Sequence, residues 1–110
     1  MNENVLLVSL RAALAITSQA FNDSLTSRIR TAQARIAEHG ITLQDTEADR
    51  DLVVMYAAWL WRSRVTGDGM PRMLQFAINN RLFSQKARTE VGDAKRAAHA
   101  VERRDHAPAL

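Results

Sequence analysis

The chain contains no cysteine, which excludes disulfide bonds, thiolate catalysis and cysteine metal ligands. Its 110 residues include only four glycines and two prolines, too few for a loop-rich or all-β fold. The three histidines, His39, His99 and His106, lie far apart and show no spacing typical of a metal site. No nucleophile stands beside a base at a recognisable spacing, so we expect neither an enzyme nor a cofactor.

Long apolar segments are also missing. The longest uninterrupted apolar run, Leu52 to Trp61, has ten residues, whereas about twenty are needed to cross a bilayer. Residues 1–4 lack the basic start of a secretory signal. We therefore expect a soluble, intracellular protein with no membrane partner.

The net charge of +3 is small and unevenly distributed. Residues 1–51 carry five basic and seven acidic side chains, residues 52–85 carry four and one, and residues 86–110 carry six and four. Nucleic-acid-binding modules usually have denser clusters of Lys and Arg. The charge is therefore compatible with nearby DNA but does not predict specific binding to it.

Helical periodicity is what the sequence does contain. Apolar residues recur at helical spacing, and Ala, Arg, Leu and Gln, all good helix formers, are frequent. The pattern predicts an all-α fold, a compact bundle of about four helices with a C-terminal extension. We expect the helices over about residues 3–14, 22–39, 47–65 and from residue 70 onward.

Polar residues and glycines mark the expected helix ends. Asn22-Asp23-Ser24 offers short polar side chains that can cap the second helix, and Gly40 suits the left-handed conformation that closes it. Thr46 to Asp49 resembles a capping box at the start of the third helix. Gly67-Asp68-Gly69 is interpreted as the turn between the third and fourth helices, since it lacks the lysine of a phosphate loop.

An acidic cluster precedes and opens the third helix. Its carboxylates suit the positive end of the helix dipole; they are Asp45, Glu47, Asp49 and Asp51. A calcium loop starting at Asp45 would need Gly at position 50 and Glu at position 56, where Arg50 and Tyr56 stand. We therefore favour the capping role.

The third helix has an unusually apolar centre. A helix with no polar side must bury every face, and a chain of this length builds only one modest core. The helix is therefore predicted to lie partly in the core and partly at an interface between subunits. On a helical wheel Trp59 and Trp61 lie about 200° apart, so we expect one in the core and the other at or near a subunit boundary.

The fourth helix also shows two apolar faces. A stripe of Met70, Met73, Leu74, Ala77 and Ile78 is predicted to face the core, with Phe76 and Phe83 on the far side. Because Arg81 falls within the stripe, we expect this helix to leave the core before that residue. The predicted core or subunit-interface residues are Leu52, Met55, Tyr56, Trp59, Leu60, Trp61, Met73, Leu74, Phe76, Ile78 and Phe83.

The apolar pattern weakens from Lys86 onward. We divide the chain into a helical core over residues 1–85 and a tail over residues 86–110. Residues 93–104 have only a thin apolar seam, and such a segment is marginal as an isolated helix. We expect it to become ordered on a partner.

Several short motifs occur in a characteristic order. They are Leu14-Ala15-Ile16-Thr17, Phe21-Asn22-Asp23, Gly40-Ile41, YAAWLWRSR over residues 56–64, and MPRMLQFAINNRLF over residues 70–83. In these motifs the chain resembles the head–tail connector, or adaptor, proteins of long-tailed bacteriophages and prophages. The resemblance covers about residues 5–85 and concerns helix-forming motifs, so it carries over no catalytic residue.

The resemblance implies a structural virion protein that forms a ring of about twelve subunits with head-to-tail contacts. Such a ring lies beneath the portal protein, receives the stopper or tail-completion protein, and lets packaged DNA pass through its lumen. It belongs to the neck of the virion and assembles in the host cytoplasm. Arg62, Arg64 and Arg72 are candidates for facing the lumen or a partner. The portal-docking tail would present Lys86, Arg88, Lys95, Arg96, Arg103 and Arg104.

Two other functions stay open on the sequence alone. One is a small helical DNA-binding regulator, which would bind short duplexes with a sequence preference and strong salt dependence. The other is an antitoxin-type interaction protein, which would copurify with one small partner.

Overall fold

The computed structural model describes residues 1–88, and within that range it contains helices and no strand. Helix α1 spans Glu3–Ala13, a short 3-10 helix η1 spans Gln19–Phe21, α2 spans Asn22–Glu38 and α3 spans Glu47–Thr66. A further helix covers residues 72–88, and we refer to it as helix 72–88. The predicted all-α bundle of about four helices is confirmed.

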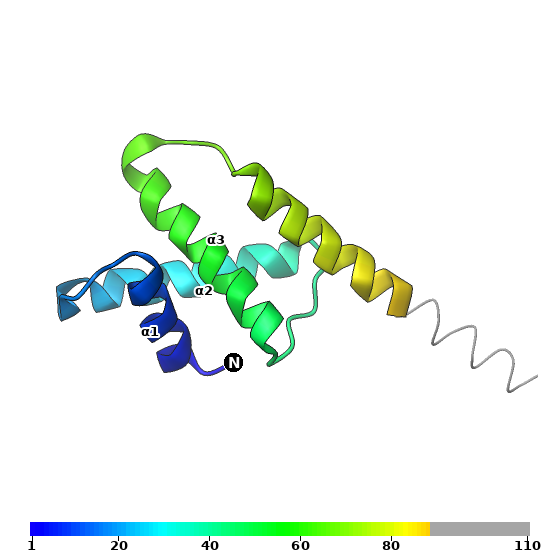
Figure 1. Ribbon diagram of the computed structural model, residues 1–110, viewed down its shortest axis with the longest axis horizontal. Coiled ribbons are helices and arrows are strands. Elements are labelled where there is room, and N and C mark those ends of the chain that lie inside the picture. Colours follow the sequence, from blue (N-terminus) through cyan, green and yellow to red (C-terminus); the bar gives the residue numbers. More distant parts are fainter. Residues whose placement is uncertain (89–110) are drawn as a thin grey trace, which may run out of the picture.

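Helix α3 is the centre of the arrangement. Figure 1 shows α2 crossing α3, with α1 and helix 72–88 on opposite sides of it. Among the first three α-helices, α2 and α3 have the most extensive contacts, followed by those of α1 with α3 and with α2. Since three helices surround α3, most of its circumference is covered within one chain.

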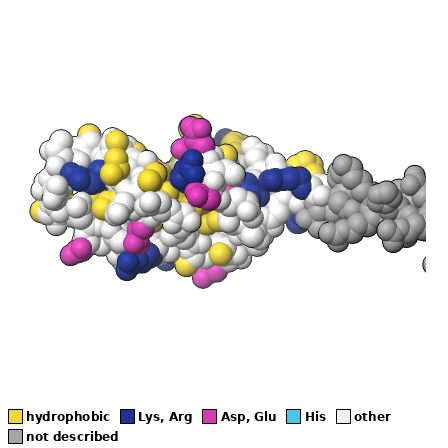
Figure 2. Space-filling model, turned by 90° about the horizontal axis from the view of Figure 1, so that it is seen from below, with side chains coloured by type: hydrophobic (Ala, Val, Ile, Leu, Met, Phe, Trp, Pro, Cys, Tyr) yellow, Lys and Arg dark blue, Asp and Glu magenta, His cyan; other side chains and the backbone are white. Residues whose placement is uncertain are grey.

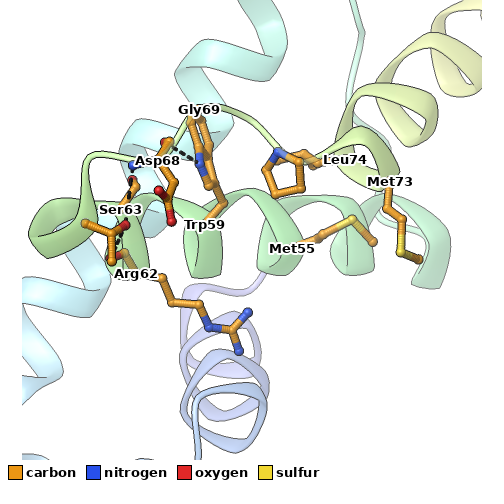
Figure 3. A pocket seen from close by; sticks show the side chains of 10 residues that line it. Met55, Trp59, Arg62, Ser63, Asp68, Gly69, Met73 and Leu74 are labelled. Atoms are coloured by element: carbon orange, nitrogen blue, oxygen red, sulfur yellow. Dashed lines mark hydrogen bonds between the residues drawn. The ribbon is translucent and has the colours of Figure 1, made fainter.

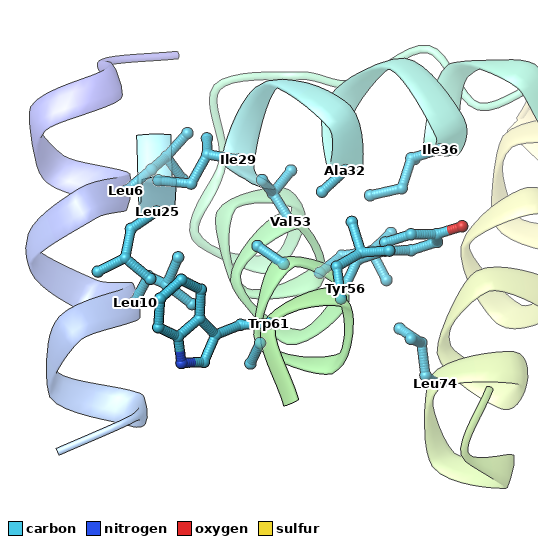
Figure 4. Packing of buried hydrophobic residues seen from close by; sticks show 14 of the residues in the cluster. Leu6, Leu10, Leu25, Ile29, Ala32, Ile36, Val53, Tyr56, Trp61 and Leu74 are labelled. Atoms are coloured by element: carbon cyan, nitrogen blue, oxygen red, sulfur yellow. The ribbon is translucent and has the colours of Figure 1, made fainter. Parts of the chain in front are cut away.

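The core forms where the apolar stripes of α1, α2 and α3 meet (Figure 4). The predicted stripe of α2 is confirmed, because Leu25, Ile29, Ala32 and Ile36 are all fully buried. Leu6 and Leu10 of α1 pack into the same cluster, and Leu74 and Ile78 join it from helix 72–88. Figure 4 shows Val53 facing α2 and Trp61 lying beside Leu10.

The apolar run in α3 is buried mainly by its own chain. Seven of the ten residues from Leu52 to Trp61 are buried, Val54 and Trp59 are half-buried, and only Met55 is exposed. The expectation that a single chain has too little interior for this run was therefore too strong. That expectation assumed that α3 packs against the core on one side, whereas three helices of the same chain pack around it.

The two tryptophans occupy opposite sides of α3. Trp61 is buried in the core, with its ring edge-on to Phe21 at 5.6 Å between centroids. Trp59 is half-buried and meets Tyr56 edge-on at 5.4 Å. The core position predicted for one tryptophan is thus that of Trp61, and the subunit-boundary position predicted for the other stays a prediction for Trp59.

The helix ends follow the sequence signals in most places. Gly40 and Gly67 adopt positive φ angles of 92° and 69° after α2 and α3, and the Thr46 hydroxyl accepts a hydrogen bond from the Asp49 N–H at 3.2 Å. The expected polar cap of α2 is wrong. Phe21 precedes the helix without a side-chain cap, and the amide oxygen of Asn22 is buried with no hydrogen-bond partner among the described residues.

The turn after α1 is a compact helix stop. The Ala15 N–H donates to the Ala12 carbonyl and the Ile16 N–H to the Arg11 carbonyl, which is the hydrogen-bond pattern of a Schellman motif. Ala15 has a positive φ of 56°, where glycine is the usual residue. The motif Leu14 to Thr17 therefore reverses the chain toward η1.

Replacing Trp61 by Ala should reduce the free energy of unfolding by about 3–5 kcal/mol, because the substitution leaves a cavity in the core. Trp59→Ala should cost less, since that ring is only half-buried. Urea denaturation followed by circular dichroism measures both, with the exposed residue Val65 changed to Ala as the control. Equal losses for the two tryptophan variants would contradict this division.

Candidate functional site

A groove runs along the exposed side of α3, between the end of α1 and helix 72–88. Three hollows of about 290, 280 and 260 Å³ form it, and Met55 lines all of them. We call it the α3 groove. Since Met55 is 39% exposed at its centre, the groove presents an apolar floor to solvent.

The largest hollow lies where α3 turns into helix 72–88 (Figure 3). Its apolar lining comes from both helices and from the turn between them: Met55, Trp59, Pro71, Met73 and Leu74. The Trp59 Nε1–H donates to the Asp68 carbonyl at 3.2 Å, so the indole is held by the turn as well as by Tyr56. This part of the groove is therefore a shaped apolar surface with its one indole donor already satisfied.

The other two hollows carry the polar groups of the groove. Asp51 lines both of them, and Arg62 lines the hollow toward α1 together with Ala13. The Arg62 guanidinium donates to the Ala13 carbonyl at 3.4 Å. The Asp51 carboxylate is exposed and makes no hydrogen bond or ion pair within residues 1–88. The groove therefore presents two exposed carboxylates, Asp51 and Asp68, and one exposed cation, Arg62, to a partner.

A buried ion pair fixes the wall that helix 72–88 contributes. Arg81 donates from Nε to Asp49 Oδ1 at 2.7 Å and from Nη2 to Oδ2 at 3.1 Å, and the two side chains are only 12% and 3% exposed. The expectation that this helix leaves the core before Arg81 is wrong. A cation inside an apolar stripe was itself the signal, because charged residues are buried almost only when paired.

The same helix also forms hydrogen bonds to the loop between α2 and α3. Arg81 Nη2 also donates to the Thr42 carbonyl at 2.8 Å, while Gln85 accepts from the Thr42 N–H at 2.8 Å and donates to the Gly40 carbonyl at 2.9 Å. Asp49 accepts in addition from the Gln44 N–H at 2.7 Å. We call Thr42, Asp49, Arg81 and Gln85 the polar clamp. It joins helix 72–88 to α3 and to the loop that precedes it.

The polar clamp determines the pKa of Asp49. Burial pushes that pKa upward, but the hydrogen bonds from Arg81 and from the Gln44 N–H, with the positive charges of Arg81 and Arg88, outweigh the burial. The pKa of Asp49 therefore lies below its usual value. In return, the hydrogen bond from Arg81 to Asp49 raises the pKa of the guanidinium. Both groups are charged at neutral pH.

The outer side of helix 72–88 exposes large apolar side chains. Phe76 is 61% exposed and Phe83 is 73% exposed, and we call this pair the Phe ridge. Met73 was expected in the inward stripe, but it is 77% exposed at the edge of the groove. The stripe that actually packs inward consists of Met70, Leu74, Ala77, Ile78, Arg81 and Leu82.

The basic candidates differ in their surroundings. Arg62, Arg64 and Arg72 are all exposed, but the Arg64 guanidinium lies 3.6 Å from the centre of the Trp61 ring. Residues 72–88 contain four basic and no acidic side chains. In Figure 2 the surface next to the grey atoms accordingly carries dark-blue and yellow side chains. Of the predicted portal-docking residues, Lys86 and Arg88 are exposed; Lys95, Arg96, Arg103 and Arg104 lie outside the described residues.

The described part of the chain holds no cluster of three or more His, Asp or Glu side chains able to bind a metal ion. The acidic residues around Thr46 are used elsewhere: Asp45 pairs with Arg50 at 2.9 Å, and Asp49 belongs to the polar clamp.

Within residues 1–88, no helix has the length and apolar character needed to cross a bilayer. No protein-family model matches the chain, and no curated protein or solved structure shows significant similarity to it.

Replacing Arg81 by Met should lower the free energy of unfolding by about 3–5 kcal/mol, because it leaves the Asp49 carboxylate buried without its cation. Arg81→Lys should restore only part of this, since an ammonium group cannot reproduce the fork that reaches Asp49 and Thr42 together. Urea denaturation gives the comparison. Arg50→Met is the matched control, because its exposed pair with Asp45 is worth less than about 1 kcal/mol. Similar losses in both Met variants would contradict the role of the polar clamp.

The polar clamp should also make stability depend on acid. A carboxylate whose pKa is lowered by folding contributes stability above its unfolded pKa, about 3.9 for Asp, and loses that contribution as the pH falls through the folded pKa. Asp49→Asn should therefore be less stable than the wild type near pH 7, and the gap should narrow below about pH 4. Urea midpoints measured across this range test it; a gap that stays constant would refute the assignment.

Proposed function

We propose that the chain is a structural subunit of the head–tail connector of a long-tailed bacteriophage or prophage. In this role it forms a ring beneath the portal, joins the capsid to the tail and leaves a passage for DNA. The observation that carries the proposal is the presence of two separate apolar surfaces, the α3 groove and the Phe ridge, on one small helical domain. Exposed apolar patches of this kind usually mark protein contacts.

The motifs shared with connector proteins support the proposal by their places in the fold. Leu14 to Thr17 forms the stop of α1, Phe21 to Asp23 leads into α2, and Gly40-Ile41 ends it. Residues 56–64 lie in α3, and residues 70–83 lead into and form most of helix 72–88. The first three motifs thus lie at helix boundaries and the fourth in the packed centre, as expected for residues that specify a fold, whereas the last also carries the exposed Phe76 and Phe83.

The proposed partners follow the same resemblance. They are other copies of the chain, the portal protein, and a stopper or tail-completion protein, with packaged DNA nearby. Arg62 and Arg72 suit an aqueous lumen or a partner, because both are exposed. Arg64 suits that role less, because its guanidinium stacks on Trp61. Residues 86–110 are proposed to reach the portal.

Electron microscopy of the purified full chain should show rings of about twelve subunits. Particles made by the encoding phage or prophage should carry the protein in the neck, detectable by an affinity label on the chain. Particles that assemble with normal necks lacking the label would overturn the proposal.

Two assays separate the competing functions. Salt-sensitive binding to a short duplex with a defined sequence preference would indicate a regulator instead. A stable one-to-one complex with a small toxin, formed without rings, would indicate an antitoxin.

A further inference from the structure

We propose that the Phe ridge of one copy of this chain seats in the α3 groove of the next copy. The contact is head-to-tail and rests on the proposed function only in requiring that the chain assemble with itself. We assign the groove to a second copy of the chain because the groove and the Phe ridge complement each other in direction, size and charge.

Direction is the first step. On helix 72–88 the inward residues Leu74 and Ile78 lie opposite Phe76 and Phe83 on a helical wheel, while Met73 and Ala77 form the edge that lines the groove. The ridge therefore lies about 90° around the helix from the edge that lines the groove of its own chain, so it faces a different side. Two different surfaces that fit each other produce a heterologous contact, which closes into a ring or continues as a filament.

Size is the second step. Phe76 and Phe83 are seven residues apart, or about 10 Å along the helix, and the groove follows α3 from Asp51 to Arg62, about 16 Å. Both rings therefore fit within its length. A buried Phe covers about 150–250 Å². The two rings supply the apolar centre of the ridge's side of the contact, and Met55, Trp59 and Met73 supply the facing apolar surface of the groove; a standard interface buries roughly 800 Å² on each side.

Charge is the third step. The ridge is flanked by Arg72 and Lys86 on a helix without acidic residues. The groove carries one exposed cation, Arg62, against the exposed carboxylates of Asp51 and Asp68, with Glu47 exposed nearer the start of α3, so its net charge is negative. Ridge and groove therefore attract each other. Two ridges brought face to face would instead oppose basic side chains, which disfavours a symmetric ridge-to-ridge dimer.

Complementary variants test the proposal on the full chain. The ridge variant carries Phe76→Glu with Phe83→Glu, and the groove variant carries Met55→Glu, with Asp51→Lys as a second groove variant that changes only an exposed charge. Val8→Glu, on an exposed residue of α1, is the matched control. Circular dichroism and urea denaturation confirm that each variant is folded, and sedimentation velocity measures association.

The ridge variant and the Met55→Glu variant should each weaken self-association by about 30-fold or more, while Val8→Glu should behave like the wild type. When the ridge variant is mixed with the Met55→Glu variant, the intact ridge of the second can seat in the intact groove of the first, which restores one contact per pair. The mixture should therefore give a one-to-one dimer that does not grow, detectable by native mass spectrometry. Asp51→Lys should weaken association in a salt-dependent manner.

Three results would overturn the proposal. The first is a wild-type chain that stays monomeric at millimolar concentration. The second is assembly that survives both the ridge and the groove changes, which would mean that the copies associate through other surfaces. The third is a mixture that remains monomeric. The label in the virion neck is read independently, so a connector assembled through other surfaces would refute this contact and leave the proposed function standing.

Discussion

The ion pair between Asp49 and Arg81 is the interaction on which the rest of the structure depends. Asp49 opens α3 and Arg81 lies in the middle of helix 72–88, so their two hydrogen bonds join the centre of the bundle to its last described helix. Arg81 and Gln85 also hold the loop after α2 through Thr42. One wall of the α3 groove and the direction of the Phe ridge both follow from this single attachment.

An ion pair suits this task better than an apolar contact because it fixes register. The inward stripe of helix 72–88 is otherwise made of apolar side chains, whose contacts are non-directional and define the position of the helix along its axis less strictly than a hydrogen-bonded pair does. A shift by one turn would move Phe76 and Phe83 along the surface by about 5 Å. A shifted helix would leave Asp49 and Arg81 buried without their partners, which costs desolvation energy. We infer that the ion pair thereby favours one register of helix 72–88 over the shifted ones.

Sequence patterns predicted the features that depend on a single helix and missed those that depend on its neighbours. The stripe of α2 and the closing role of Gly40 follow from periodicity and local backbone geometry, so both were predictable. The burial of α3 was underestimated because a helical wheel does not show that three helices surround one. Arg81 was misjudged because its partner lies 32 residues earlier, in a position that also fits a helix cap. The groove has no sequence signal at all, since its lining comes from α1, α3 and helix 72–88 together.

The direction of the proposed contact between copies follows from the side chains that stay exposed when the polar clamp holds helix 72–88 in place. Two large aromatic side chains in water are a liability for a small protein unless something covers them. In the proposed assembly, the basic side chains of helix 72–88 disfavour contact between two Phe ridges, and the acidic first half of α3 favours contact with a ridge. The attraction thus favours contacts between unlike surfaces, which can repeat around an axis. In the proposed assembly, the polar clamp orients both surfaces within one chain, so folding alone would set the direction of the contact between copies.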